Sequence, residues 1–201
     1  MSDLAQHIAA LVGSRLCHDL INPIGAIGNG VELVALDPRP KPAEMALLAD
    51  SVAAANARLR FFRIAFGSAT PDQSTSRMEV VPMLGDLYRT GRVSVDWQSP
   101  PEMPRIEVKL AFLMLLCAEH AIPTGGNIGI LRDDGGWHVT AASPRLRHDA
   151  TLWSLLSEVR DDVRVEPGQV QFPLVGLLLG SSGRRASVDV GQTSLSISLD
   201  R

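Results

Sequence analysis

Two long helical stretches separated by a proline-rich break constrain the fold of this chain more than any other feature. Between residues 3 and 36, apolar residues recur at alternating spacings of four and three, which is the pattern of a packed helix. This row consists of Leu20, Ile24, Ile27, Val31 and Val34. Extended backward, it includes Cys17, Gly13 and Ala10. The segment 37–42, Asp-Pro-Arg-Pro-Lys-Pro, cannot continue a helix, although Pro42 suits the first turn of the next one.

A second helix is predicted from Pro42 to Phe66, ended by Gly67. Its apolar residues follow the same spacing, at Met45, Leu48, Val52, Ala55, Leu59, Phe62 and Phe66. Two such helices joined by a tight turn form an antiparallel hairpin that leaves half of each apolar face uncovered. The pattern therefore predicts a homodimer in which two hairpins form a four-helix bundle around a two-fold axis.

The remainder of the chain has the pattern of a second, mixed domain. Residues 1–67 are interpreted as the hairpin, residues 68–77 as a linker rich in Ser, Thr, Gly and Pro, and residues 78–201 as an α/β domain. Strands are expected at 78–80, 92–97, 127–132, 137–142, 186–190 and 193–199, and helices at 82–89, 106–121, 149–159 and 170–179. The predicted fold is α+β, a helical hairpin followed by a two-layer α/β sandwich.

Composition narrows the functional class. The formal net charge of −3 and the lack of a basic stripe argue against a nucleic-acid partner. No apolar run approaches the roughly 20 residues of a membrane span, and the first residues lack the pattern of a signal peptide, so a cytoplasmic location is expected. Cys17 and Cys117 form no metal-binding or disulfide pattern and are expected to be buried thiols. Neither a metal site nor a tightly bound cofactor is predicted.

The chemistry concentrates in the segment 14–26, Ser-Arg-Leu-Cys-His-Asp-Leu-Ile-Asn-Pro-Ile-Gly-Ala. His18 follows Cys17 by one position, which places its ring on the flank of the predicted bundle, where another protein can reach it. A neutral imidazole nitrogen is a good nucleophile near neutral pH. The histidines at positions 7, 120, 138 and 148 have no comparable setting.

The neighbours of His18 suggest supporting roles. Asp19 is a candidate to orient the imidazole or accept its proton. Asn22, four residues on, and Arg15, three residues before, share the helix face of His18, so a phosphoryl group bonded to the ring would be within their reach. Arg15 is a candidate contact for phosphate or for an acidic partner. Pro23 lacks an N–H inside the helix and predicts a kink or local bulge.

These residues resemble the phosphoacceptor box of histidine kinases, and the segment 18–24, His-Asp-Leu-Ile-Asn-Pro-Ile, fits that box throughout. The wider segment 16–33, Leu-Cys-His-Asp-Leu-Ile-Asn-Pro-Ile-Gly-Ala-Ile-Gly-Asn-Gly-Val-Glu-Leu, resembles the ChpT-type histidine phosphotransferases of alphaproteobacteria. This likeness extends through the hairpin and, more weakly, over the whole chain. It implies a phosphohistidine at His18 and a second domain descended from an ATP-binding module.

The motifs that such a module needs are missing from this sequence. The segment 110–122 takes the place of the helix whose asparagines hold Mg²⁺ in kinases, and it contains no Asn. Residues 141–147, Ala-Ala-Ser-Pro-Arg-Leu-Arg, stand where a kinase has an Asp-x-Gly-x-Gly loop. Asp-Asp-Gly-Gly at 133–136 is predicted to be a hairpin turn, and Gly-Ser-Ser-Gly at 180–183 a helix C-terminus. The sequence therefore predicts neither ATP binding nor autophosphorylation.

The resulting prediction is a phosphotransferase that relays a phosphoryl group through His18 between receiver domains. The expected partners are response-regulator receivers and the receiver domain of a hybrid histidine kinase, with Mg²⁺ supplied by the receiver. Two alternatives remain open: an ATP-dependent histidine kinase with a diverged pocket, and a non-catalytic regulator that docks on kinases or receivers. A further activity compatible with the relay is hydrolysis of receiver phosphate assisted by Asn22.

Overall fold

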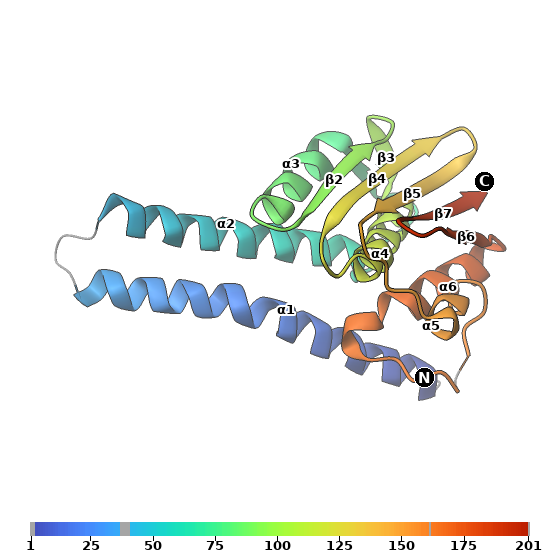
Figure 1. Ribbon diagram of the computed structural model, residues 1–201, viewed down its shortest axis with the longest axis horizontal. Helices are drawn as coiled ribbons and strands as arrows, with labels where there is room; N and C mark the ends of the chain where they lie inside the picture. Colours follow the sequence, from blue (N-terminus) through green and yellow to red (C-terminus); the bar gives the residue numbers. More distant parts are fainter. Residues whose placement is uncertain (1–2, 37–40, 161, 201) are drawn as a thin grey trace.

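The computed structural model describes residues 3–36, 41–160 and 162–200. Its first part is a hairpin of two helices, α1 (Asp3–Leu36) and α2 (Pro42–Ala65), which lie side by side and antiparallel (Figure 1). The predicted proline-rich turn falls mostly outside the described residues, at 37–40. In the described part of the chain, none of the helices has the length and hydropathy needed to cross a bilayer.

The second part is a five-stranded sheet with helices packed against it. Its strands are β2 (Val93–Gln98), β4 (Gly126–Asp133), β5 (Gly136–Ala142), β6 (Ala186–Val190) and β7 (Ser194–Asp200). Its helical segments are α3 (Arg77–Tyr88), α4 (Arg105–Ala121), α5 (Ala150–Ser154), α6 (Gln171–Ser182) and the short 3-10 turn η1 (Pro167–Gln169). Two further strands, β1 (Ser74–Ser76) and β3 (Glu102–Pro104), pair with each other to form an antiparallel two-stranded sheet.

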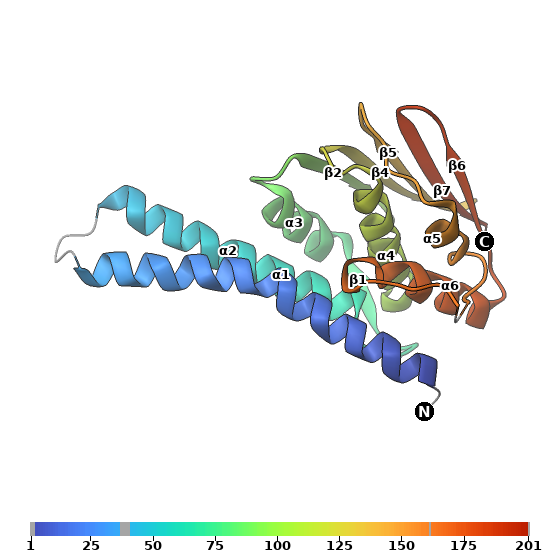
Figure 2. The same ribbon diagram turned by 60° about the horizontal axis from the view of Figure 1, so that its bottom comes forward.

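The sheet has the strand order β2-β4-β5-β7-β6, with β2 and β4 parallel and the other neighbours antiparallel. Along β5, Trp137, Val139 and Ala141 are buried, whereas the alternate residues His138 and Thr140 are not. This alternation belongs to a sheet that buries one face. Figure 2 shows the helices α3, α4 and α6 on the same side of the sheet, so the domain has two layers.

The core of this domain is built around α4. Eleven of its 17 residues are buried, including Phe112, which lies against Trp97 with a ring-centroid distance of 5.5 Å. Phe61, near the end of α2, stacks on Phe112 at 4.5 Å. The base of the hairpin therefore shares the core of the α/β domain.

The apolar residues of the hairpin separate into two rows. In α1, Leu20, Ile27 and Val34 are half-buried, whereas Ile24 and Val31 are exposed by 59% and 53%. The same division appears in α2: Leu48 is half-buried and Ala55 and Phe62 are buried, and three residues seven apart stay exposed, namely Met45, Val52 and Leu59. Each helix thus uses one row inside the hairpin and presents the other outward. Cys17 falls in the outward row and is exposed, so the expectation of a buried thiol holds for Cys117 only.

Several element predictions are confirmed and several are wrong. The strands near 92–97, 127–132, 137–142, 186–190 and 193–199 are found, as are the turn at 133–136 and the αL helix end at Gly183, whose φ is 67°. The predicted strand at 78–80 is helical, because α3 already begins at Arg77, where the Ser76 hydroxyl accepts a hydrogen bond from the Glu79 amide. The strand lies earlier, within the predicted linker 68–77, and pairs with β3, which was not predicted. The helix expected at 149–159 is the short α5.

Candidate functional site

His18 stands in the middle of α1 with its side chain in solvent. Its exposed fraction is 81%, as the flanking position in the hairpin predicts. The Nδ1 atom lies 3.2 Å from Asp19 Oδ1. Because an ionised carboxylate only accepts hydrogen bonds, this contact requires a hydrogen on Nδ1, and a neutral ring then has its lone pair on Nε2. The geometry leaves Nε2 as the nucleophilic atom.

Asp19 is held on its other side by Arg15. Arg15 Nε donates to Asp19 Oδ2 at 2.7 Å, one turn earlier on the same helix. Both side chains are largely shielded, with exposed fractions of 15% and 16%. One carboxylate oxygen is thus fixed by a charge-assisted bond, and the other faces the imidazole.

The guanidinium of Arg15 also contacts the second domain. Its Nη1 donates to the Gly168 carbonyl oxygen at 2.7 Å and to Gln171 Oε1 at 3.2 Å. Figures 1 and 2 show η1 and the start of α6 crossing beside this part of α1. The expected contact of Arg15 with phosphate stays a prediction; in this structure the side chain joins Asp19 to the α/β domain.

Pro23 does not interrupt α1, which is helical on both sides of it, so the expected bulge is not seen as a break. Its missing N–H leaves the Asp19 carbonyl without the usual partner four residues on. Arg58 of α2 takes that position, and its Nη1 donates to the Asp19 carbonyl oxygen at 3.3 Å. Asp19 is therefore held at its side chain from α1 and at its backbone from α2. Asn22 lies exposed one turn after His18, and its role stays a prediction.

A groove of about 560 Å³ opens beside His18. It is lined by Ser14, Arg15, His18, Asp19, Glu166, Pro167 and Gly168. The last three residues come from the second domain and were missed in the sequence, as was Gln171. No local motif distinguishes them, since they reach the site only through a contact that spans 153 positions.

Comparison with known proteins decides the family. Residues 77–194 match the model of the histidine phosphotransferase C-terminal domain. The chain belongs to the histidine phosphotransferase family. It is 31% identical over 190 residues to the protein phosphotransferase ChpT of Brucella abortus (strain 2308), an alignment that covers 92% of this chain and 90% of that protein. A bacterial phosphotransferase of known structure is similar over 100% of this chain and 98% of its own, with a TM-score of 0.80 and 29% identity.

The resemblance stated from the segment 16–33 is therefore confirmed, and the chain is a phosphotransferase of a phosphorelay. The comparisons give the family of the molecule as a whole.

Arg15 and Asp19 also line a smaller polar cavity of about 190 Å³, which is bounded by α1, α2, α3 and α4. In its wall, the Tyr88 hydroxyl donates to Glu119 Oε2 at 3.1 Å. Burial raises the pKa of the Glu119 carboxyl above its ordinary value, while the hydrogen bond from Tyr88 and the charges of Arg15 and Arg58 act in the opposite direction. Burial, together with the Glu119 charge, also raises the pKa of Tyr88 well above its usual range.

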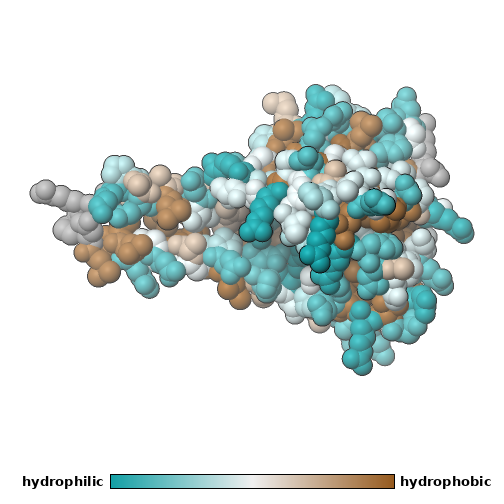
Figure 3. All heavy atoms as spheres, viewed as in Figure 1, coloured by the Kyte–Doolittle hydropathy of each residue, from teal (hydrophilic) through white to brown (hydrophobic). Residues whose placement is uncertain are grey.

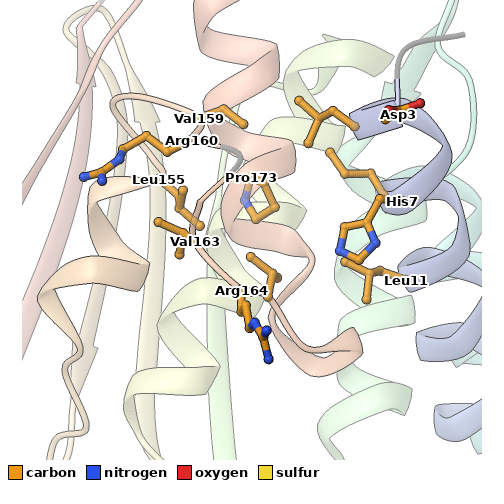
Figure 4. A pocket seen from close by; sticks show the side chains of 12 residues that line it. Asp3, His7, Leu11, Leu155, Val159, Arg160, Val163, Arg164 and Pro173 are labelled. Atoms are coloured by element: carbon orange, nitrogen blue, oxygen red, sulfur yellow. The ribbon is translucent and has the colours of Figure 1, made fainter.

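A third cavity, of about 400 Å³, separates the first turns of α1 from the segment that connects α5 to η1. Figure 4 shows His7 and Leu11 on one side of it and Leu155, Val163 and Pro173 on the other. Its walls are mainly aliphatic. The contact between α1 and the second domain is consequently loose on this side of the site.

Aromatic side chains pack between α4, α5 and α6. Phe172 of α6 makes edge contacts with Trp153 of α5 at 5.0 Å and with His120 of α4 at 5.5 Å. The loop 141–147 is tied to the end of α4 by a hydrogen bond from the Arg147 amide to the Ala121 carbonyl oxygen at 2.8 Å. Across residues 3–36, 41–160 and 162–200, no three His, Cys, Asp or Glu side chains are grouped as metal ligands.

Proposed function

We propose that this phosphotransferase carries the phosphoryl group on Nε2 of His18 and relays it between aspartates of receiver domains. The observation that supports this most directly is the combination at His18 of an exposed ring and an Nδ1 held by Asp19. A buried or unoriented histidine would serve a relay poorly, because the phosphoryl donor and acceptor are both on other proteins.

In the first step, the Nε2 lone pair attacks the phosphorus of a receiver aspartyl phosphate in line. The N–P bond forms as the P–O bond to the aspartyl oxygen breaks, and the receiver carboxylate leaves. The ring then has a substituent on both nitrogens, and Asp19 accepts the Nδ1 hydrogen bond that stabilises its positive charge. The second step is the reverse: a carboxylate of another receiver attacks phosphorus, and neutral His18 leaves. The phosphoryl group is conserved, so no nucleotide enters the cycle.

The groove beside His18 supplies the docking surface in this proposal. One of its walls is α1 and the other is the Glu166–Gly168 segment of the second domain. A receiver that inserts its aspartate toward His18 would contact both walls, which gives the α/β domain a role in recognition. The Mg²⁺ that receivers use for their own phosphorylation would arrive with the receiver and neutralise charge on the transferred group.

A second copy of the chain is the proposed partner of the hairpin. The described part of the chain has 14 large apolar residues that are exposed, and nine of them belong to α1 and α2. Figure 3 shows hydrophobic patches, in brown, along the part of the hairpin that extends beyond the α/β domain. Five of the nine recur at a spacing of seven residues, which matches the seam of a bundle: Ile24, Val31, Met45, Val52 and Leu59. Two hairpins would cover each other's outward rows and place two copies of His18 on the surface of one dimer.

We further propose that the chain does not phosphorylate itself from ATP. The packing of Phe172 against Trp153 and His120 occupies the space between α4 and α6 with ring atoms, and a purine would have to displace them. Replacing this cluster would expose apolar surface and cost stability. This packing supports the relay over the kinase alternative.

The deciding experiment mixes the purified chain with a receiver domain carrying ³²P-labelled aspartyl phosphate. Rapid appearance of acid-labile, alkali-stable label on the chain is expected, followed by its transfer to a second receiver. His18→Ala should abolish the label, whereas His138→Ala, a change on the sheet far along the chain, should leave it intact. Label that survives His18→Ala would exclude the relay through this residue.

Two control experiments distinguish the relay from the kinase and from the non-catalytic regulator. Incubation with labelled ATP alone should give no label, and label on His18 under these conditions would favour the kinase. A non-catalytic regulator predicts instead that receivers bind His18→Ala and wild-type protein equally and that neither chain becomes labelled.

A further inference from the structure

Gln171 is a buried polar residue of the second domain. Both the nitrogen and the oxygen of its side-chain amide form hydrogen bonds. It is the first residue of α6, and only 1% of its surface is exposed. Its Nε2 donates to the carbonyl oxygens of Gly168 at 3.1 Å and Leu116 at 3.4 Å. Its Oε1 accepts from Arg15 Nη1 at 3.2 Å. The chemistry of these partners fixes the amide orientation, because carbonyls can only accept and a guanidinium can only donate.

Arg15 transmits this fixed orientation to the site. The guanidinium that contacts Gln171 and Gly168 through Nη1 holds Asp19 Oδ2 through Nε. A guanidinium is planar and rigid, so fixing one end of it fixes the direction in which the other donates. Asp19 Oδ1 is then left facing His18 Nδ1. A continuous series of hydrogen bonds thus connects α4 and α6 to the imidazole ring.

The cavities around Arg15 leave its hydrogen bonds as the main restraint on the orientation of its side chain. Arg15 lines both the groove of about 560 Å³ beside His18 and the cavity of about 190 Å³ on the other side of Asp19. Apolar packing around Arg15 is therefore interrupted on two sides. A long side chain with few contacts samples many rotamers unless hydrogen bonds hold it.

A buried glutamine at the start of a core helix lowers stability unless its polar atoms form hydrogen bonds. An apolar residue of similar volume would fill this position without that cost. We infer that Gln171 is a positioning residue for phosphoryl transfer, which sets the orientation of the His18 ring and its Nδ1–H tautomer through Arg15 and Asp19. The inference rests on the proposed role of His18 and adds to it that the α/β domain completes the site from a distance.

The test measures the imidazole directly, in the full-length chain labelled with ¹⁵N. Nitrogen shifts of His18 report which ring nitrogen carries the hydrogen, and they do so whether or not any phosphate is transferred. In wild type we expect mainly the Nδ1–H tautomer. Gln171→Leu should give the tautomer mixture of an unconstrained histidine and slow single-turnover transfer from a phosphorylated receiver by about tenfold, because the nucleophile is no longer oriented.

Two further variants separate positioning from general stability. Gln171→Glu loses the two bonds to the carbonyl oxygens of Gly168 and Leu116 but keeps an acceptor for Arg15, and because its carboxylate forms a charge-assisted bond with the guanidinium, it should retain the wild-type tautomer. Val175→Ala removes a buried side chain one turn along the same helix without contacting Arg15, and should leave the His18 spectrum unchanged despite a loss of stability. A wild-type spectrum in Gln171→Leu, or an altered one in Val175→Ala, would overturn the inference.

The same bonds can be broken from the hairpin if Gln171→Leu does not fold. Arg15→Met leaves the α/β core intact and should produce the same tautomer mixture. Where Gln171→Leu does fold, adding it to Arg15→Met should have no further effect on the ring. An unchanged His18 spectrum in Arg15→Met overturns the inference. A wild-type chain that shows the Nδ1–H tautomer but takes no label would instead contradict the proposed function and leave the positioning of the ring in place.

Discussion

The hairpin and the α/β domain differ in how many of their apolar residues a single chain buries. In α4, eleven of 17 residues are buried within one chain, whereas α1 buries Ile8 alone among its 34. Both helices are rich in aliphatic residues, so composition does not explain the difference. The α/β domain wraps its central helix with a sheet and two further helices, and the hairpin has only its own second helix. The contrast supports the proposal that a second copy of the chain completes the hairpin, while the domain buries its own apolar residues.

The largest effect is expected on the surface where the hairpin is proposed to bind a second copy of the chain. Ile24→Lys combined with Val31→Lys would bury four ammonium groups in one dimer, and we expect the dimer dissociation constant to rise at least about a thousandfold. Sedimentation across a range of concentrations measures it. Val81→Lys with Leu131→Lys, which alters similarly exposed apolar residues of the α/β domain, should leave the constant unchanged. If Ile24→Lys with Val31→Lys formed a dimer as tight as wild type, the outward row of the hairpin would not be the dimer interface.

The next effect is expected in the core of the α/β domain. Trp137 is fully buried and donates from Nε1 to Glu107 at 2.9 Å, so Trp137→Ala should lower the free energy of unfolding by about 3–5 kcal/mol. Urea unfolding followed by circular dichroism measures this loss, which should not depend on protein concentration. Ile24→Ala should behave oppositely, with a loss that appears only at concentrations where the dimer forms. If the stability losses of the two variants depended on protein concentration in the same way, the proposed difference between the α/β domain and the hairpin would be contradicted.

A smaller effect is expected at the junction of the two regions. Tyr88→Phe removes the donor that satisfies the buried Glu119 carboxylate and should cost about 1–3 kcal/mol of unfolding free energy. The double variant Tyr88→Phe with Glu119→Leu leaves no unsatisfied group and should recover part of the loss. If the single variant is as stable as wild type in thermal and urea unfolding, the cavity behind Asp19 supplies water to Glu119 in place of the tyrosine.

The smallest effect is expected at a helical glycine of α1. An added Cβ at Gly28 meets no atom within 4 Å in a single chain, so Gly28→Ala should stabilise the hairpin by up to about 1 kcal/mol through helix propensity alone. Gly176→Ala is the opposite case, because its Cβ would collide with the Leu155 carbonyl oxygen, and it should destabilise the α/β domain. A weaker dimer in Gly28→Ala would instead place the partner's backbone against this glycine.

Much of the molecule follows from local patterns. The spacing of apolar residues located both long helices, and a seven-residue box located His18 together with Asp19. The alternation in β4 and β5, with Asp-Asp-Gly-Gly between them, located their hairpin. The errors fall where local pattern is weak: β1 and β3 are three residues each and exist by pairing with one another, and α3 begins at a cap that precedes the residues read as a strand.

The sequence by itself determined which residue is proposed to do the chemistry, because the box of seven residues occupies only two turns of one helix. It also determined which apolar residues recur at spacings of four and three along each helix. Only the tertiary structure decided which row faces inward, what holds Asp19, and that the second domain reaches the site. The Arg15 contacts to Gly168 and Gln171 join positions more than 150 residues apart, and the bond from Arg58 to the carbonyl that Pro23 leaves free joins positions 39 apart. Such polar contacts have no period and no motif, since their partners become neighbours only when the hairpin packs on the folded domain.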